Sequence, residues 1–317
     1  MNGREITPAV RPEGVMEGVQ VIAGACGVRV LNLSFQVDTP SRPCLGEHSA
    51  ARLAVVRQGA FSYRTGRQTH LVGPGAVILV NPGESYEILR EFDSHAQSTV
   101  FEYPEAVMEQ LVSRMRTGIE RARGRYFAVP VLPPAPRIEA LHRLVWVAIR
   151  DAGDRLRLLE LLCTIAAEVS REAEAACEAQ DGVTPVSRRR FARARVRDAA
   201  RFIETHAKDP VTLSDVSTAL QLSRFHFVRM FRQEVGLTPH QYLIRMRLRR
   251  SINLLLETAL PVTEIASVAG FGDLSHLSHA FRKHVGCPPG ALRLGPAALI
   301  RNGLTSSWPG LGAVSPS

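Results

Sequence analysis

Basic side chains gather in the C-terminal third of this 317-residue chain. Residues 187–294 contain 18 Lys and Arg against 8 Asp and Glu, a formal charge of +10, whereas the whole chain carries +9. All other residues together therefore carry about −1. Lysine and arginine bind phosphate groups, and such contacts supply most of the sequence-independent affinity of proteins for nucleic acids. The charge distribution predicts that residues 187–294 bind a polyanion; the alternative is a solvated basic face that binds nothing.

The same segment contains two copies of one short unit, fifty residues apart. Aromatic, basic, glycine and proline positions recur at this spacing: Phe231 and Phe281, Arg232 and Arg282, Gly236 and Gly286, and Pro239 and Pro289. Such a recurrence indicates one supersecondary structure formed twice. The repeat therefore favours a folded domain whose two copies share a function over a solvated basic face that binds nothing.

Each copy predicts two short helices joined by a tight turn. In the first copy, Thr212 with Asp215 predicts the start of one helix, and Ser223 predicts the cap of the next. Asp273 predicts the corresponding cap in the second copy. The apolar side chains that anchor the second helix of each copy are Phe227, Met230, Phe231, Leu277 and Phe281. A single helix from Pro239 to Glu257 connects the copies, which gives two helix-turn-helix units.

These spaced residues resemble the DNA-binding domain of the AraC/XylS family of transcription regulators. The matching positions are Leu222, Ser223, Phe227, Arg229, Phe231, Gly236 to Pro239, Tyr242, Arg247, Leu248, Leu254, Leu255, Ile265, Ala266, Gly270, Phe271, Ser275, Phe281, Gly286, Pro288 and Pro289. The resemblance implies that two recognition helices enter successive major-groove segments on one face of double-stranded DNA. It also implies RNA polymerase as a partner, a homodimer, and activation more than repression.

The resemblance further implies which side chains touch DNA. These are Arg224, Phe225, Val228, Arg229 and Arg232 in the first recognition helix, and Leu274, Ser275, Ser278, His279 and Arg282 in the second. Arg229 and His279 occupy the same position of the two copies. Arginine can donate two hydrogen bonds to one guanine, whereas histidine cannot and, with an ordinary pKa of about 6.5, is mostly neutral at pH 7. We expect the first helix to carry more sequence information, whether His279 contacts a base or only a phosphate.

Residues 19–103 have the alternation and the turns of β structure. Alternating side chains from Val28 to Phe35 predict a strand. The Thr65-Gly66 pair predicts a hairpin turn between Phe61–Tyr63 and Gln68–Val72.

The run from Gly73 to Ile88 places a buried strand between two Gly/Pro turns and resembles the second motif of cupin-like barrels. A histidine is usual in that motif where this chain has Tyr86, so we expect no metal and no cofactor. A barrel without a metal predicts a small organic effector in an apolar interior. Tyr63 and Tyr86 are the candidate polar contacts to that effector.

Five cysteines, at positions 26, 44, 163, 177 and 287, form no CxxC pair. Their odd number and wide spacing argue against a disulfide framework or a zinc ribbon and favour a reducing cytoplasm. Cys44 and His48 supply only two ligands, too few to close a metal site. Two alternatives stay open: a thiol- or metal-responsive regulator that uses Cys44 or Cys26, and a DNA-binding domain fused to a cupin-like enzyme. We expect a regulator that is not an enzyme.

Helical periodicity begins at Pro104 and predicts three helices. The third has an apolar stripe that includes Leu158, Leu162, Ile165 and Val169. Such a stripe either packs on its own domain or forms the seam of a dimer.

The predicted fold is a multi-domain α and β protein. Its parts are a disordered N-terminus at 1–18, a cupin-like sensor β-barrel at 19–103, a helical packing or dimerisation region at 104–180, a linker at 181–187, an all-α DNA-binding domain with two helix-turn-helix units at 188–294, and a disordered tail at 295–317. Neither a signal peptide nor a run of about 20 apolar residues is found, so we expect a cytoplasmic protein that does not enter a membrane.

Overall fold

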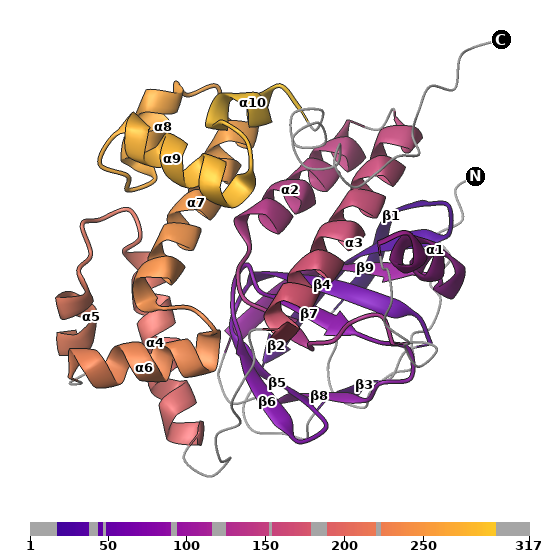
Figure 1. Ribbon diagram of the computed structural model, residues 1–317, viewed down its shortest axis with the longest axis horizontal. Coiled ribbons are helices and arrows are strands. Elements are labelled where there is room, and N and C mark those ends of the chain that lie inside the picture. The colour runs from indigo at the N-terminus through magenta and orange to yellow at the C-terminus, as the bar shows by residue number, and fades with distance from the viewer. Residues whose placement is uncertain are drawn as a thin grey trace.

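The computed structural model describes residues 18–37, 44–46, 49–89, 94–115, 125–151, 154–178, 189–219 and 223–295. The predicted linker 181–187 lies outside these residues, as do both predicted disordered ends except for Gly18 and Gly295. Figure 1 shows a β-rich N-terminal part beside a C-terminal group of helices, with the long helices α2 and α3 lying over the strands. The two parts are therefore packed against each other through helices.

The larger sheet of the N-terminal part is antiparallel, with the strand order β1-β2-β9-β4-β7-β10. Its strands are β1 (Gly18–Ala25), β2 (Val28–Val37), β9 (Ser94–Tyr103), β4 (Ala51–Gln58), β7 (Val77–Val80) and β10 (Val131–Leu132). Every position of β7 is buried, as predicted for the strand between two Gly/Pro turns. β10 was not predicted, because its two residues lie in a proline-rich segment and are held only by pairing with β7.

The smaller sheet has the order β3-β8-β5-β6. Its strands are β3 (Cys44–Gly46), β8 (Tyr86–Leu89), β5 (Phe61–Thr65) and β6 (Gln68–Val72). β5 and β6 form the predicted hairpin, but Thr65 pairs with Gln68, so the turn residues are Gly66 and Arg67 rather than Thr65 and Gly66. Gly66 has a φ of 53°, the left-handed conformation that such a two-residue turn requires.

The two sheets share one buried apolar cluster, formed by Val56, Phe61, Tyr63, Val72, Ala76, Ile78, Val80 and Ala96. Apart from Ala76, which precedes β7, these side chains come from strands of both sheets, so the apolar faces of the sheets pack together. The β-rich N-terminal domain predicted from the alternation is confirmed.

Three helices pack on this domain: α1 (Glu105–Met115), α2 (Pro136–Arg150) and α3 (Arg155–Glu178). The apolar stripe of α3 is buried, and Leu162, Ile165 and Val169 are each 0% exposed. The hydroxyl of Tyr103 in β9 donates a hydrogen bond of 2.8 Å to the carbonyl oxygen of Leu162. The stripe therefore packs on its own domain, the first of its two predicted roles.

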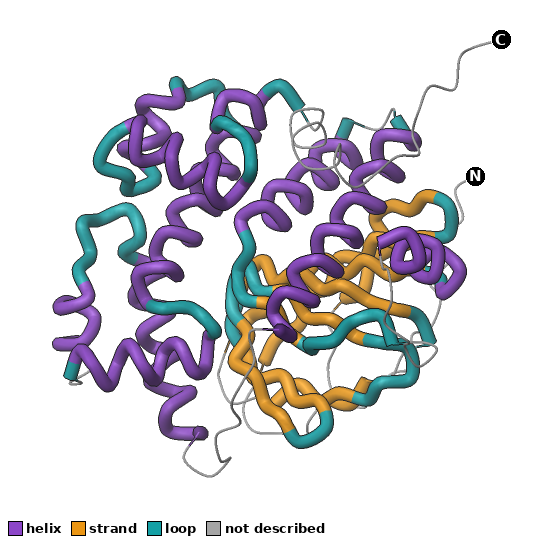
Figure 2. The backbone as a smooth tube through the Cα atoms, viewed as in Figure 1, coloured by secondary structure: helices purple, strands orange, loops and turns teal. Residues whose placement is uncertain are grey.

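The C-terminal part consists of helices joined by loops over the described residues (Figure 2). Its helices are α4 (Arg189–Thr205), α5 (Leu213–Ala219), α6 (Arg224–Val235), α7 (Pro239–Glu257), α8 (Val262–Val268), α9 (Leu274–Val285) and α10 (Pro289–Arg293). α7 has the predicted bounds and begins with a capping box, in which the backbone N–H of Gln241 donates to Thr238 Oγ1 at 3.3 Å and that of Thr238 donates to Gln241 Oε1 at 2.9 Å. α4 was not predicted as a helix.

The two helix-turn-helix units are packed in different ways. The first unit, α5 and α6, shares a core with α4 and the beginning of α7. The core of the second unit, α8 and α9, includes Ile265, Leu277 and Phe281 and is continuous with the core of α2 and α3. α6 also contacts β6, and α9 contacts α2. Both units are thus docked on the N-terminal domain.

Among the described helices, none combines the length and the apolar character needed to span a bilayer.

Candidate nucleic-acid interface

Helix α6 is fixed by its cap, its buried face and its last turn. The backbone N–H of His226 donates to Ser223 Oγ at 3.4 Å, as the N-cap prediction requires. Phe227 and Phe231 are fully buried, and the Phe231 ring lies edge-on to Tyr242 of α7 with a centroid separation of 5.4 Å. Gly236 ends the helix at a φ of 79°. The orientation of α6 on α7 is therefore set by packing.

The opposite face of α6 presents the predicted contact residues to solvent. Arg224, Arg229 and Arg232 are exposed, Val228 is half-buried, and Phe225 is 81% exposed. Arg224 Nη2 donates to Ser214 Oγ of α5 at 2.8 Å, which ties the two helices of the unit together. This face offers guanidinium donors for phosphates or guanine and apolar surface for a thymine methyl group.

Helix α9 repeats the scheme with different chemistry. The backbone N–H of His276 donates to Asp273 Oδ1 at 2.7 Å, and Leu277 and Phe281 are fully buried. The predicted contact residues Leu274, Ser275, His279 and Arg282 are exposed and Ser278 is half-buried. This face carries one guanidinium among the predicted residues, whereas the face of α6 carries three.

One interaction of the connecting helix was not anticipated from the sequence. Arg247 of α7 donates from Nε to the carbonyl oxygen of Ala207 at 2.8 Å and from Nη2 to that of Asp209 at 2.9 Å. These bonds hold the segment between α4 and α5 on α7. Arg247 therefore orients the first unit and is a structural residue.

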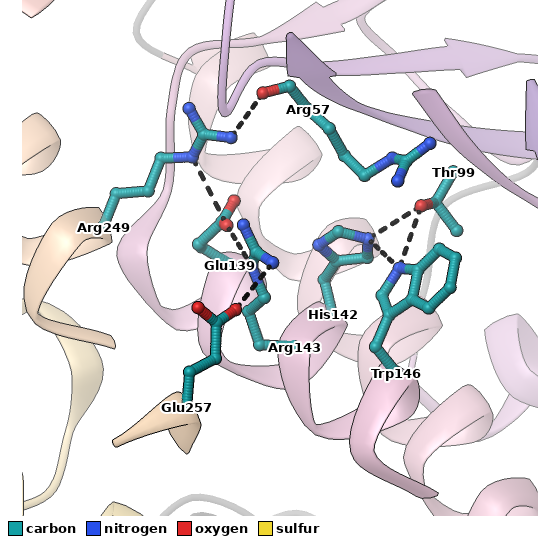
Figure 3. A network of polar contacts seen from close by, with 8 residues as sticks. All are labelled: Arg57, Thr99, Glu139, His142, Arg143, Trp146, Arg249 and Glu257. Atoms are coloured by element: carbon teal, nitrogen blue, oxygen red, sulfur yellow. Dashed lines mark hydrogen bonds and ion pairs between the residues drawn. The ribbon is translucent and has the colours of Figure 1, made fainter. Parts of the chain in front are cut away.

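A network of charged side chains joins α7 to the N-terminal domain (Figure 3). Arg249 Nη2 donates to the carbonyl oxygen of Arg57 at 2.6 Å, and its Nε lies 3.3 Å from Glu139 Oε1 on α2. Arg143 Nε donates to the same Glu139 oxygen at 3.2 Å, and its Nη1 lies 3.5 Å from Glu257 Oε1. Burial by itself raises the pKa of Glu139, but Arg249 and Arg143 hold that pKa below its usual value. Glu139 is thus an anion shared between the two domains.

Next to this network, α2 makes a buried contact with β9. His142 Nε2 lies 2.9 Å from Thr99 Oγ1 and accepts a hydrogen bond of 3.0 Å from Trp146 Nε1. The Arg57 guanidinium lies over the Trp146 ring, 5.2 Å from its centroid. Complete burial lowers the pKa of His142 to about 3, so the imidazole is neutral at physiological pH.

The predicted effector contacts lie in the smaller sheet. Tyr63 is buried in the cluster shared by the two sheets, and its ring centroid is 5.4 Å from that of half-buried Tyr86. Burial raises the pKa of Tyr63 above its ordinary value. The two rings lie side by side within a closely packed core.

Of the two cysteines in the alternative hypothesis, the structure describes the side chain of Cys26 alone. Cys26 is exposed in the turn between β1 and β2, with a φ of 48°. Cys44 begins β3, while its side chain and His48 lie outside the described residues. Where the structure describes the chain, no three His, Cys, Asp or Glu residues are grouped to hold a metal ion.

Comparison with known proteins matches both parts of the chain. Residues 216–295 match the family described as a helix-turn-helix domain, and residues 43–166 match the AraC-like ligand binding domain. The probable transcriptional regulator LumQ of Photobacterium leiognathi is 33% identical over 88 residues, 28% of this chain and 36% of LumQ. The transcriptional activator RhaS of Salmonella paratyphi B is 37% identical over 100 residues, 32% of this chain and 36% of RhaS. The matched segment thus spans about a third of the length of these relatives.

Among solved structures, the C-terminal domain of AraT, a response regulator from Geobacillus stearothermophilus, is 34% identical, with 32% of this chain and 84% of that chain covered and a TM-score of 0.31. The sequence matches to the two families lie in the order ligand-binding domain, then helix-turn-helix domain. The chain thus combines an AraC-like ligand binding domain with a helix-turn-helix domain, and over the latter it is similar to transcriptional regulators such as RhaS.

Proposed function

We propose that this protein is a sequence-specific DNA-binding regulator that activates transcription in response to a small organic effector. The observation that carries the proposal is the pair of repeated helices, α6 and α9, each capped, anchored through buried phenylalanines and exposed on the face that holds the predicted contact residues. Because both helices pack against the continuous helix α7, their separation is fixed, as reading two successive major-groove segments requires. The positive charge of residues 187–294 supports phosphate binding by the same domain.

The residues divide into base-reading and phosphate-binding roles. Arg229, Phe225 and Val228 lie near the middle and the beginning of α6, where a recognition helix meets base edges, and we assign them to base contacts. Arg232 and Arg282 lie one turn later in their helices and are assigned to phosphates. His279 takes the place of Arg229 in α9.

Activation requires contact with RNA polymerase, and we infer that the protein acts as a homodimer in the cytoplasm. We also infer that it has no enzyme activity, since its relatives are transcriptional regulators.

DNA binding by two fragments tests which part of the chain contacts DNA. Residues 187–294 should bind a random-sequence DNA duplex and residues 1–180 should not, because the positive charge lies in the former. The affinity, measured by fluorescence anisotropy, should fall roughly a thousandfold or more between about 50 and 200 mM salt if about six or more phosphates are contacted. Circular dichroism of each fragment serves as the control for folding. DNA binding by residues 1–180 and not by residues 187–294 would contradict the proposal.

A further inference from the structure

A cavity of about 1030 Å³ lies between the ligand-binding domain and the first helix-turn-helix unit. We propose that this cavity, rather than the interior of the barrel, is the effector site, and that it takes an organic anion with an apolar body. The inference rests on the proposed function and gives the effector a place and a chemical class.

Both domains form the walls of this interdomain cavity. The N-terminal domain contributes the turn at Gly59, Leu71 of β6, the prolines that follow β10 and Ala175 at the end of α3. The C-terminal domain contributes α4, the end of α6 and the first turns of α7. Its volume matches the roughly 300–1,000 Å³ of sites that enclose small molecules. In contrast, the side chains shared by the two sheets around Tyr63 are packed against one another.

Apolar groups cover much of the cavity wall. They include Leu71, Leu132, Ala176, Ala200, Val235 and Leu237. The Tyr242 ring adds an aromatic surface. Such a lining favours the apolar body of a ligand over a small hydrated ion.

The charged groups of the lining determine the sign of the ligand. Three carboxylates line the cavity: Glu204 Oε1 accepts from the Tyr242 hydroxyl at 2.5 Å, Glu172 pairs with Arg171 at 2.7 Å, and Glu234 also has an interaction partner. In the described part of the chain, Arg201, Arg232 and Arg245 form no ion pair with a carboxylate, although Glu204 attracts Arg201 and Glu172 attracts Arg245 from a longer distance. The lining therefore offers guanidinium groups that no carboxylate contacts directly.

Arg245 is the cation placed deepest in this set. Its Nη1 donates to the carbonyl oxygen of Pro134, a neutral acceptor. Burial lowers the pKa of Arg245, because the guanidinium has lost water without gaining a full counter-charge. A carboxylate or sulfonate on the ligand would provide that counter-charge through charge-assisted hydrogen bonds.

A ligand in this cavity would also affect the DNA-binding face, because both domains form the walls of the cavity. A ligand that touches walls from both domains stabilises the arrangement in which those walls face each other. Arg232, at the rim of the cavity, is also one of the predicted DNA contacts of α6. An anion held by Arg232 therefore competes with phosphate for the same guanidinium.

A matched pair of fluorescent probes tests the site in the full chain without DNA. 1-Anilinonaphthalene-8-sulfonate carries an anionic group on an apolar body, and N-phenyl-1-naphthylamine has the same body without the sulfonate. We expect saturable binding of one sulfonate probe per chain, about tenfold tighter than the uncharged probe, as for one charge-assisted hydrogen bond. Equal affinities, or binding that does not saturate, would overturn the proposal.

Four variants locate the binding. Ala175→Trp fills the cavity from an exposed position and should abolish binding of both probes, while Ala106→Trp at an exposed position of α1 should leave it unchanged. Arg245→Gln should weaken the sulfonate probe about tenfold and spare the uncharged probe. The exposed Arg155→Gln is its control. Sulfonate binding that survives both Ala175→Trp and Arg245→Gln would place the probe elsewhere and refute the site.

The DNA affinity of the full chain distinguishes a failure of the proposed effector site from a failure of the proposed function. If the sulfonate probe binds in the cavity and changes DNA affinity, and the change disappears in Ala175→Trp, the regulatory role is supported. If the probe binds there and DNA affinity does not change, the cavity is not the effector site. A chain that binds the probe but no DNA refutes the proposed function, whatever the cavity holds.

Discussion

At the scale of single residues, Arg229 and His279 differ most in what they can recognise. Both are exposed at the same position of their helices, α6 and α9. Arg229→Ala should relax base preference in one half of the operator, because a bidentate hydrogen bond to guanine is lost. The free-energy difference between the preferred base and the others should decrease by about 1 to 3 kcal/mol. His279→Ala should cost less at pH 7.5. Selection of binding sites from random duplexes measures both, and stronger base preferences lost with His279→Ala and kept with Arg229→Ala would reverse the assignment.

The buried His142 side chain makes the stability of the protein depend on pH. Its folded-state pKa of about 3 lies below the ordinary value of 6.5, because the imidazole is buried. The unfolded chain therefore takes up a proton below pH 6.5 that the folded chain refuses until about pH 3. The contribution of His142 to the free energy of unfolding is fully present above pH 6.5. As the pH decreases from 6.5 towards 3, this contribution is lost by up to about 1.4 kcal/mol per pH unit.

Urea unfolding at pH 7.5 and 5.5 measures this contribution. His142→Gln removes the titrating group and keeps an acceptor near Thr99, so the parent should lose roughly 1 kcal/mol more than the variant between the two values. Equal losses in the two proteins would show that His142 does not control acid stability.

At the scale of the elements, capping residues in the sequence predicted the helix-turn-helix units. Elements that form only through contacts with distant parts of the chain were not predicted. Thr238 and Pro239 define the start of α7, and Ser223 and Asp273 define the starts of α6 and α9, because each cap bonds to a backbone group three residues away. In contrast, β10 exists only through Val131 and Leu132 pairing with β7. Nothing within its own sequence neighbourhood predicts that strand.

The tight turn between α8 and α9 depends on Gly270 in a way that the sequence does not reveal. Gly236 and Gly270 both have left-handed φ values, 79° and 90°. A Cβ at Gly236 would meet nothing nearer than Pro133 at 3.9 Å, whereas one at Gly270 would lie 2.4 Å from the carbonyl oxygen of Ala207. The turn is therefore packed closely against the segment that follows α4.

Alanine at these two positions separates backbone strain from close packing. Gly236→Ala should cost about 1–2 kcal/mol of unfolding free energy, because only the left-handed conformation is penalised. Gly270→Ala should cost about 1–3 kcal/mol more, because the backbone near Ala207 must also move. Chemical denaturation of the two variants compares them directly, and equal costs would mean that the turn can shift freely.

At the scale of the whole molecule, charge and repeats in the sequence predicted two domains but not their docking. The segment that carries the basic excess also contains Arg249, whose partners Glu139 and Arg57 are far away in the chain. No spacing rule connects such residues. The same limit applies to the effector site: the sequence indicated the barrel residues Tyr63 and Tyr86, whereas the interdomain cavity exists only when two domains meet.

The ion pair between Glu139 and Arg249 provides a test of that docking. Glu139 is 4% exposed and Arg249 is 17% exposed, so water screens the pair poorly and the loss of either partner leaves a buried charge. Glu139→Gln and Arg249→Gln should each destabilise the chain, and the double variant should lose less than the sum, with a coupling of about 1–3 kcal/mol.

The exposed pair Arg150 and Asp151, with side chains 67% and 62% exposed, is the matched control, and its variants should be close to additive. Unfolding free energies of the two double-mutant cycles give the comparison. Because Glu139 lies on α2 and Arg249 on α7, coupling in the first cycle can arise only if the two domains are in contact in solution. Additivity there as well would mean that the domains are not held together through this pair.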